Sequence, residues 1–189
     1  MLTVLTVLTQ NPQFILGNLR VGNLLARLRA GAGSPELAKN WWRIHIAGDM
    51  RLVLDTNVLI AAFRSRAGAA AEVVRLVRRR ELTMVATVAL FVEYEAVLTR
   101  PQHLATAKMT VAEAEIALDV LAAVAEPVES YFLWRPRLRD ADDDMVLEAA
   151  VSGRADAIAT FNTRDFTGVQ SEFGIAVLTP AGILKEIVK

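Results

Sequence analysis

From residue 50 onward, short apolar runs alternate with amphipathic stretches. Four apolar runs have the length of buried strands, at residues 51–54, 82–86, 157–160 and 175–178. A further short strand is expected after Pro127. Strands separated by helices form βαβ units, which build a parallel sheet. The pattern therefore predicts an α/β fold with a mostly parallel central sheet flanked by helices.

The helices between these strands are predicted by spacing and by their ends. Apolar residues at three-and-four spacing from Ala70 to Val77 predict one helix. Two helix ends are expected, one before Pro101 and one at Gly153. Four helix starts are expected, at Thr87, at the capping-box pair Thr110 and Glu113, within residues 142–144, and at Thr179-Pro180.

Residues 1–49 lack this periodicity and contain the breaker-rich run at residues 31–35. They carry five Lys and Arg against two Asp and Glu, of 21 each in the whole chain, which leaves 16 against 19 for residues 50–189. Met50 directly precedes the first strand, as an initiator would. We therefore expect residues 1–49 to be a poorly structured or over-extended segment, and residues 50–189 to form the domain.

Composition excludes several classes of protein. The chain has 189 residues, which suits one core, and no apolar run reaches the ~18 to 20 residues of a membrane span. The apolar start lacks a basic region and a cleavage site, so it does not resemble a signal peptide. The absence of cysteine excludes disulfides, zinc-thiolate sites and thiol nucleophiles. A cytoplasmic protein is expected.

Polar residues follow two of the predicted strands at their carboxyl ends, where open parallel sheets bind ligands. Asp55 ends the first strand, Thr160 ends the strand at residues 157–160, and Asn162 and Asp165 follow it. Simpler roles are open for each position. Asp55 suits a helix N-cap, and an Asx-turn would explain either Asn162 or Asp165.

Two further acidic positions lie on predicted helices. Glu93 shares a helix face with Leu90 and Val97, and a buried carboxylate is costly unless it is paired or binds a metal ion. Residues 140–144 contain four carboxylates, which repel one another unless a cation or a helix N-terminus offsets their charge. Alternatively, Glu93 is a solvated charge on the helix surface, and residues 140–144 are an acid-rich first turn of a helix.

Together these residues offer oxygen ligands only. The two histidines, His45 and His103, lie apart from any acidic or serine motif, so a nucleophilic triad finds no support. Oxygen ligands select Mg²⁺ or Mn²⁺, which activate water and bind phosphate oxygens, and a phosphodiester is the natural substrate. The mildly acidic balance of residues 50–189 argues against binding by phosphate neutralisation alone.

Four stretches resemble the successive motifs of the PIN-domain family, in family order, at residues 54–60, 93–101, 140–147 and 160–166. The resemblance covers residues 50–180 and is nearest to VapC-like toxins of bacterial toxin–antitoxin systems. It implies a PIN-like three-layer fold and a ribonuclease that uses Mg²⁺, or Mn²⁺. It also implies a cognate antitoxin and a homodimer, for which the face around Phe91, Leu98 and Leu118 is the candidate contact.

The resemblance also assigns roles to single residues. Asp55, Glu93 and Asp143 match the metal positions, with Asp140 and Asp144 as rivals of Asp143, and Asp165 completes the catalytic set. The supporting residues would be Thr56, Asn57, Thr160 and Asn162. Asn162 stands where many relatives have Asp, which leaves a second metal open.

Two alternative functions remain. One is a catalytically weak RNA-binding PIN scaffold, for which Asn162 is the suggestive residue. The other is an α/β phosphatase, although the sequence Asp55-Thr56-Asn57 lacks the second Asp of such a nucleophile motif.

Overall fold

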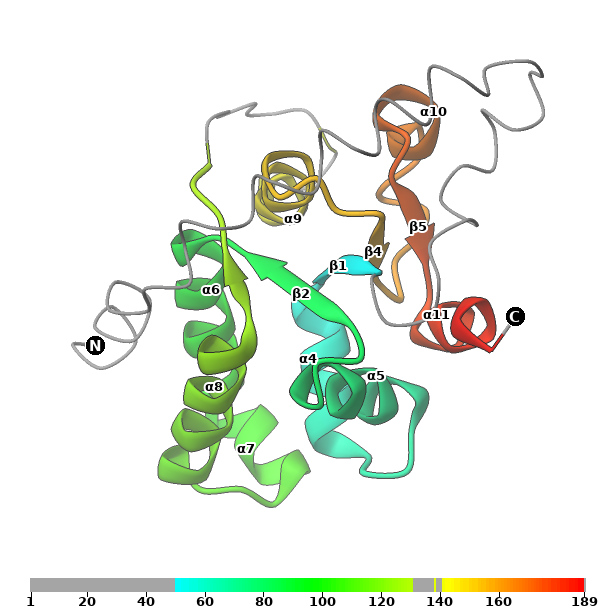
Figure 1. Cartoon of the computed structure of the whole chain (residues 1–189). Helices are drawn as coiled ribbons and strands as arrows, with labels where there is room; N and C mark the ends of the chain where they lie inside the picture. The colour runs from blue at the N-terminus through cyan, green and yellow to red at the C-terminus, as the bar shows by residue number, and fades with distance from the viewer. Residues whose placement is uncertain (1–49, 131–137, 139–140, 189) are drawn as a thin grey trace, which may run out of the picture. The chain divides into compact units, whose positions relative to one another are not determined.

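A computed structural model describes residues 50–130, 138 and 141–188 of the chain, although for Ala141 and Asp142 only the backbone (Figure 1). These residues belong to one compact unit. The expectations for residues 1–49 lie outside the described residues, and so do those for Asp140. They remain predictions.

The sheet of this unit is parallel, with strand order β3-β2-β1-β4-β5 (Figure 1). Its strands are β1 (Arg51–Leu54), β2 (Thr83–Ala86), β3 (Glu126–Pro127), β4 (Ala157–Ala159) and β5 (Ala176–Leu178). The predicted α/β class is confirmed. The strand expected after Pro127 instead includes that residue, because β3 is an edge strand, where proline is tolerated.

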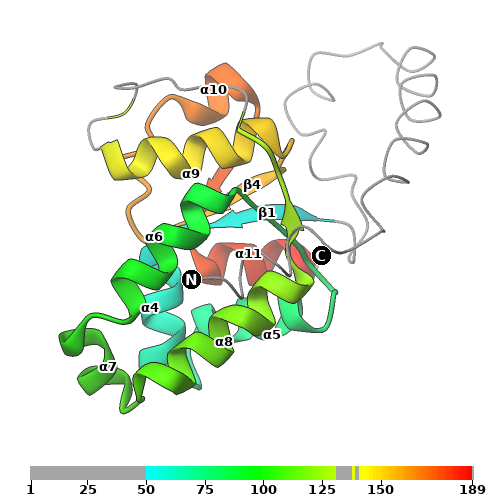
Figure 2. The same cartoon turned by 90° about the vertical axis from the view of Figure 1, so that its left-hand side faces the viewer.

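Helices cover both faces of the sheet. They are α4 (Thr56–Arg64), α5 (Ala69–Arg78), α6 (Val88–Leu98), α7 (Pro101–Ala107), α8 (Val111–Val124), α9 (Ala141–Ser152), α10 (Val169–Phe173) and α11 (Pro180–Ile187). Helix α9 packs on β1, β2 and β4, while α5 packs on α4 and α11. Figure 2 shows α9 on one side of β1, and α11 and α5 on the other. The result is a three-layer arrangement.

Three of the predicted helix starts are confirmed by their hydrogen bonds. The Thr87 hydroxyl accepts from the Leu90 backbone N–H, and the Thr179 hydroxyl accepts from the Gly182 N–H. Thr110 and Glu113 form the complete capping box, with each side chain accepting from the other residue's backbone N–H. These caps satisfy N–H groups that have no partner within the helix.

The face that we expected to form a dimer contact lies in the core. Phe91 and Leu98 of α6 and Leu118 of α8 are all buried. Phe91 and Leu98 are seven residues apart and therefore share one side of α6, and α6 packs against α8. That contact prediction is wrong, because these side chains are used within the domain.

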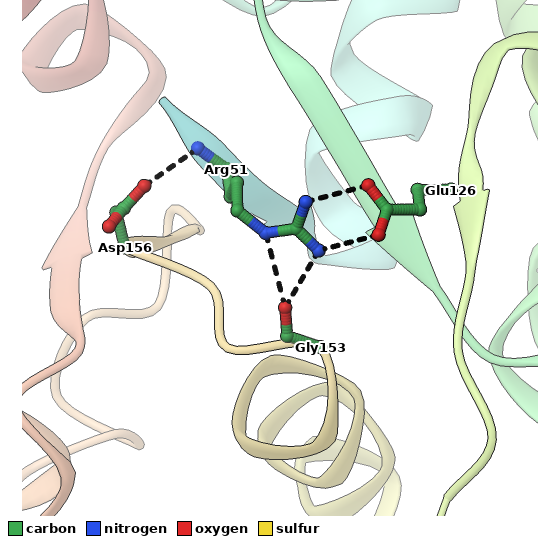
Figure 3. A network of polar contacts seen from close by, with 4 residues as sticks. All are labelled: Arg51, Glu126, Gly153 and Asp156. Atoms are coloured by element: carbon green, nitrogen blue, oxygen red, sulfur yellow. Dashed lines mark hydrogen bonds and ion pairs between the residues drawn. The ribbon is translucent and has the colours of Figure 1, made fainter. Parts of the chain in front are cut away.

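Arg51 joins several elements at the amino end of β1 (Figure 3). Its guanidinium donates to both carboxylate oxygens of Glu126, at 2.6 and 3.0 Å, and to the Gly153 carbonyl, at 2.9 Å from Nη2. Its backbone N–H donates to Asp156 Oδ2 at 2.8 Å. One residue therefore connects β1 with β3, with the end of α9 and with the start of β4.

We predict that Arg51→Met lowers the free energy of unfolding by about 1 to 3 kcal/mol, because the buried Gly153 loses donors to its carbonyl oxygen. The exposed ion pair with Glu126 adds little. Urea denaturation measures the change. Arg78→Met, at the exposed end of α5, is the control and should stay within about 0.5 kcal/mol. Equal losses in both variants would contradict this role.

Candidate active site

Asp55 lies where β1 ends and α4 begins. Its backbone N–H donates to the Ala159 carbonyl of β4 at 3.0 Å, which places it at the carboxyl edge of the sheet, as predicted. Its Oδ1 accepts from the Asn57 backbone N–H at 3.3 Å, so Asp55 is also the N-cap of α4. The capping bond involves one carboxylate oxygen, and the residue is 6% exposed.

The second carboxylate oxygen of Asp55 accepts two side-chain hydrogen bonds. Thr160 Oγ1 and Asn57 Nδ2 each donate to Oδ2 at 2.6 Å. Asn57 Nδ2 also lies 3.3 Å from Thr160 Oγ1, to which it donates. Thr160 follows β4, the strand next to β1, so parallel pairing brings these residues together. We call these three residues the Asp55 cluster.

The loop after β4 is fixed to the Asp55 cluster by two backbone hydrogen bonds. The Phe161 N–H donates to Asn57 Oδ1 at 3.2 Å, and the Asn162 N–H donates to Thr160 Oγ1 at 2.9 Å. The Asn162 side chain itself is exposed, and Asp165 is half-buried. The structure thus unites Asp55, Asn57 and Thr160, with Asn162 joining through its backbone.

Burial raises the pKa of the Asp55 carboxyl, and hydrogen bonds from Thr160, Asn57 and the Thr56 backbone offset part of that rise. The buried Tyr94 hydroxyl donates to the carbonyl of Leu54, the residue before Asp55. Burial and the nearby Asp55 charge hold the pKa of Tyr94 well above its usual value, so it is a neutral donor. An ionised Asp55 is costly here unless a cation offsets its charge.

The other predicted ligands lie on α6 and α9. Glu93 and Asp143 are half-buried, whereas Asp144 is 1% exposed and accepts the Leu138 backbone N–H at 2.7 Å. Among the described side chains, no three carboxylates or imidazoles lie close enough together to hold a metal ion. The structure therefore does not gather Asp55, Glu93 and Asp143 into one compact cluster. Their joint role remains a prediction.

Two residues near these positions were missed from sequence. Tyr94 immediately follows Glu93, and it is buried beside Phe91, three residues earlier on the same side of α6. Glu148 is buried on α9, four residues after Asp144 and therefore on the same side of the helix. The four-residue spacing between these two acidic residues is the sequence signal that indicates a shared face.

A protein-family model described as the PIN domain matches residues 51–164, more than half of the chain. The chain belongs to the PIN-domain family. PIN domains are generally nucleases that bind nucleic acid, and they typically use divalent metal ions. No curated protein and no solved structure matches the chain. In the described part of the chain, no helix is long and apolar enough to cross a membrane.

The oxygen atoms of the Asp55 cluster fit a divalent cation by their chemistry. They are the carboxylate oxygens of Asp55 and the hydroxyl oxygen of Thr160, the kind of ligand that Mg²⁺ and Mn²⁺ prefer, whereas Asn57 presents its amide nitrogen to Asp55 and its amide oxygen to the Phe161 N–H. A buried carboxylate whose pKa is raised by desolvation also gains from a nearby positive charge. The residues present are therefore suited to the metal that the family uses.

We predict that Thr160→Val lowers the free energy of unfolding by about 1 to 3 kcal/mol, because the buried hydroxyl both donates to Asp55 and accepts from Asn162. Thr160→Ser keeps the hydroxyl and is the matched control, with a smaller loss. Chemical denaturation of both variants measures the difference. If valine were tolerated as well as serine, the hydrogen bond to Asp55 would not contribute to stability.

Proposed function

We propose that this PIN domain is a metal-dependent endoribonuclease that cleaves single-stranded RNA. The observation that carries the proposal is the buried Asp55 carboxylate, held by Thr160 and Asn57 at the carboxyl ends of β1 and β4. Open parallel sheets bind ligands at this edge. Membership of a nuclease family makes a phosphodiester the fitting substrate.

In this proposal Asp55, Glu93 and Asp143 hold Mg²⁺, with Mn²⁺ as a substitute. The cation, when bound, supplies positive charge for phosphate oxygens and an activated water. The chain's own contribution is positioning. Thr160 and Asn57 fix the orientation of Asp55. Hydrogen bonds of this kind normally hold a metal ligand in one geometry.

The remaining predicted residues have supporting roles in the same proposal. Asp165 is the further catalytic carboxylate, on the loop that is fixed to the Asp55 cluster. Thr56 orders Asp55 through its backbone N–H, and Asn162 orders Thr160 in the same way. Asn162 brings no charge for a second metal ion, so one ion is the simpler arrangement.

The biological role that we propose is the toxin of a toxin–antitoxin pair in the cytoplasm. Its support is the likeness of the motifs at residues 54–60 and 160–166 to those of VapC-like toxins. A cognate antitoxin and a homodimer are part of this proposal. Because Phe91, Leu98 and Leu118 are buried, the dimer contact has to use other side chains.

We predict that the purified protein cleaves single-stranded RNA in Mg²⁺ or Mn²⁺ and stops when EDTA is added, because the oxygen-only site has no other source of activated water. The assay follows a labelled oligonucleotide on a denaturing gel, with excess Mg²⁺ restored after chelation as the control. RNA binding without cleavage would instead support the RNA-binding scaffold. Cleavage that persists under thorough chelation would refute the metal mechanism.

We predict that Asp55→Asn and Asp143→Asn each lower the cleavage rate by ~10² or more, because each removes a negative charge that holds the cation. Single-turnover kinetics at saturating Mg²⁺ measure the effect. Glu115→Gln, an exposed charge on α8, is the matched control and should keep the wild-type rate. A near-normal rate for folded Asp143→Asn would transfer the role to Asp140 or Asp144.

A further inference from the structure

Phe161 is an exposed aromatic residue directly beside the Asp55 cluster. It is 50% exposed, and it is the one aromatic among the exposed large apolar side chains of the described residues. The others are aliphatic, at Val88, Val92, Val111, Ile116, Val120 and Val188. Single exposed apolar residues are ordinary on protein surfaces, so exposure alone would mean little. The position and anchoring of Phe161 distinguish it.

The backbone that carries this ring is fixed to the candidate site. The Phe161 N–H donates to Asn57 Oδ1 at 3.2 Å, and Asn57 in turn donates to Asp55 Oδ2. Thr160, one residue earlier, bonds Asp55, and Asn162, one residue later, bonds Thr160. Consecutive Cα atoms are about 3.8 Å apart, so the ring is attached within one residue of a ligand-orienting hydroxyl.

The next turn of the loop is fixed as well. The Asp165 N–H donates to the Asn162 carbonyl at 3.0 Å, and the Thr167 hydroxyl donates to the Arg164 carbonyl at 2.6 Å. Phe161 is therefore an exposed ring on an ordered backbone. Preorganised aromatic side chains bind at low entropic cost, because few torsions have to be fixed.

We propose that Phe161 stacks on an unpaired nucleobase next to the scissile phosphate and so aligns a single strand over Asp55. Aromatic stacking on successive bases is the general means by which proteins hold single-stranded RNA, and it accepts any base because every base has a π-face. A paired base in a duplex is already stacked and offers no free face. The inference rests on the ribonuclease function proposed above and adds the residue that holds the unpaired strand in place.

The test is a coupling measurement between Phe161 and the RNA. The kcat/KM of wild type, Phe161→Ala, Phe161→Leu and Phe161→Tyr is measured on one single-stranded oligonucleotide. The same four proteins are then assayed on oligonucleotides with an abasic residue at each position that flanks the cleaved bond. Ile116→Ala, an exposed apolar residue on α8, is the matched control.

We expect Phe161→Ala and Phe161→Leu to lose about 5- to 100-fold in kcat/KM, while Phe161→Tyr and Ile116→Ala keep the wild-type value. One abasic position should cost wild type a similar factor and cost Phe161→Ala little more, because the stacking partner is already absent. A duplex substrate should be cleaved poorly by all four proteins.

The outcomes separate the two proposals. If wild type cleaves RNA but Phe161→Ala is equally active, stacking is refuted and the nuclease stands. Stacking would also be refuted if the loss in kcat/KM from Phe161→Ala multiplied with the loss from an abasic residue at every flanking position. Phe161 would then have a structural role, which thermal unfolding of the variant would check. If wild type cleaves no RNA, the nuclease proposal fails, and the stacking proposal fails with it.

Discussion

The hydrogen bond from Thr160 to Asp55 is the interaction on which the candidate site depends. The two residues are 105 positions apart in the chain, and they meet because β1 and β4 are neighbouring parallel strands with Leu54 opposite Ala159. Each residue directly follows its strand, so the strand register also sets the distance between the side chains. Asn57 then completes the Asp55 cluster from the first turn of α4, which Asp55 itself caps.

This arrangement retains a carboxylate in a place where ionisation is unfavourable. Asp55 is nearly inaccessible, its pKa is raised by burial, and the hydroxyl of the buried Tyr94 bonds the carbonyl of Leu54 at the end of β1. An Asp that only caps a helix needs one carboxylate oxygen for the capping bond, and it can fill that role at an exposed position. The burial of the second oxygen among donors is better explained by a need for one fixed orientation than by stability of the helix start.

The strands and most helix starts could be predicted because their determinants are local. Apolar runs mark buried parallel strands, and capping residues such as Thr87 and Thr110 mark helix starts. The side of α6 that faces the core could not be predicted, since apolar residues surround most of that helix. For that reason the predicted dimer contact around Phe91, Leu98 and Leu118 was wrong. The bridging amide of Asn57 depends on contacts with Thr160 and Phe161, just after β4, which no local pattern reveals.

Residues at both ends of the four-residue strand β1 make side-chain contacts that depend on the strand's position in the sheet. At its amino end Arg51 binds Glu126, Gly153 and Asp156, and at its carboxyl end Asp55 meets Thr160. Shifting a strand by one residue turns every side chain to the opposite face, so neither end can move alone. The guanidinium of Arg51 bonds Glu126 and Gly153, and its backbone N–H bonds Asp156 just before β4. The register that places Leu54 opposite Ala159 is therefore supported at both ends of β1, by Asp156 at the amino end and by Thr160 at the carboxyl end.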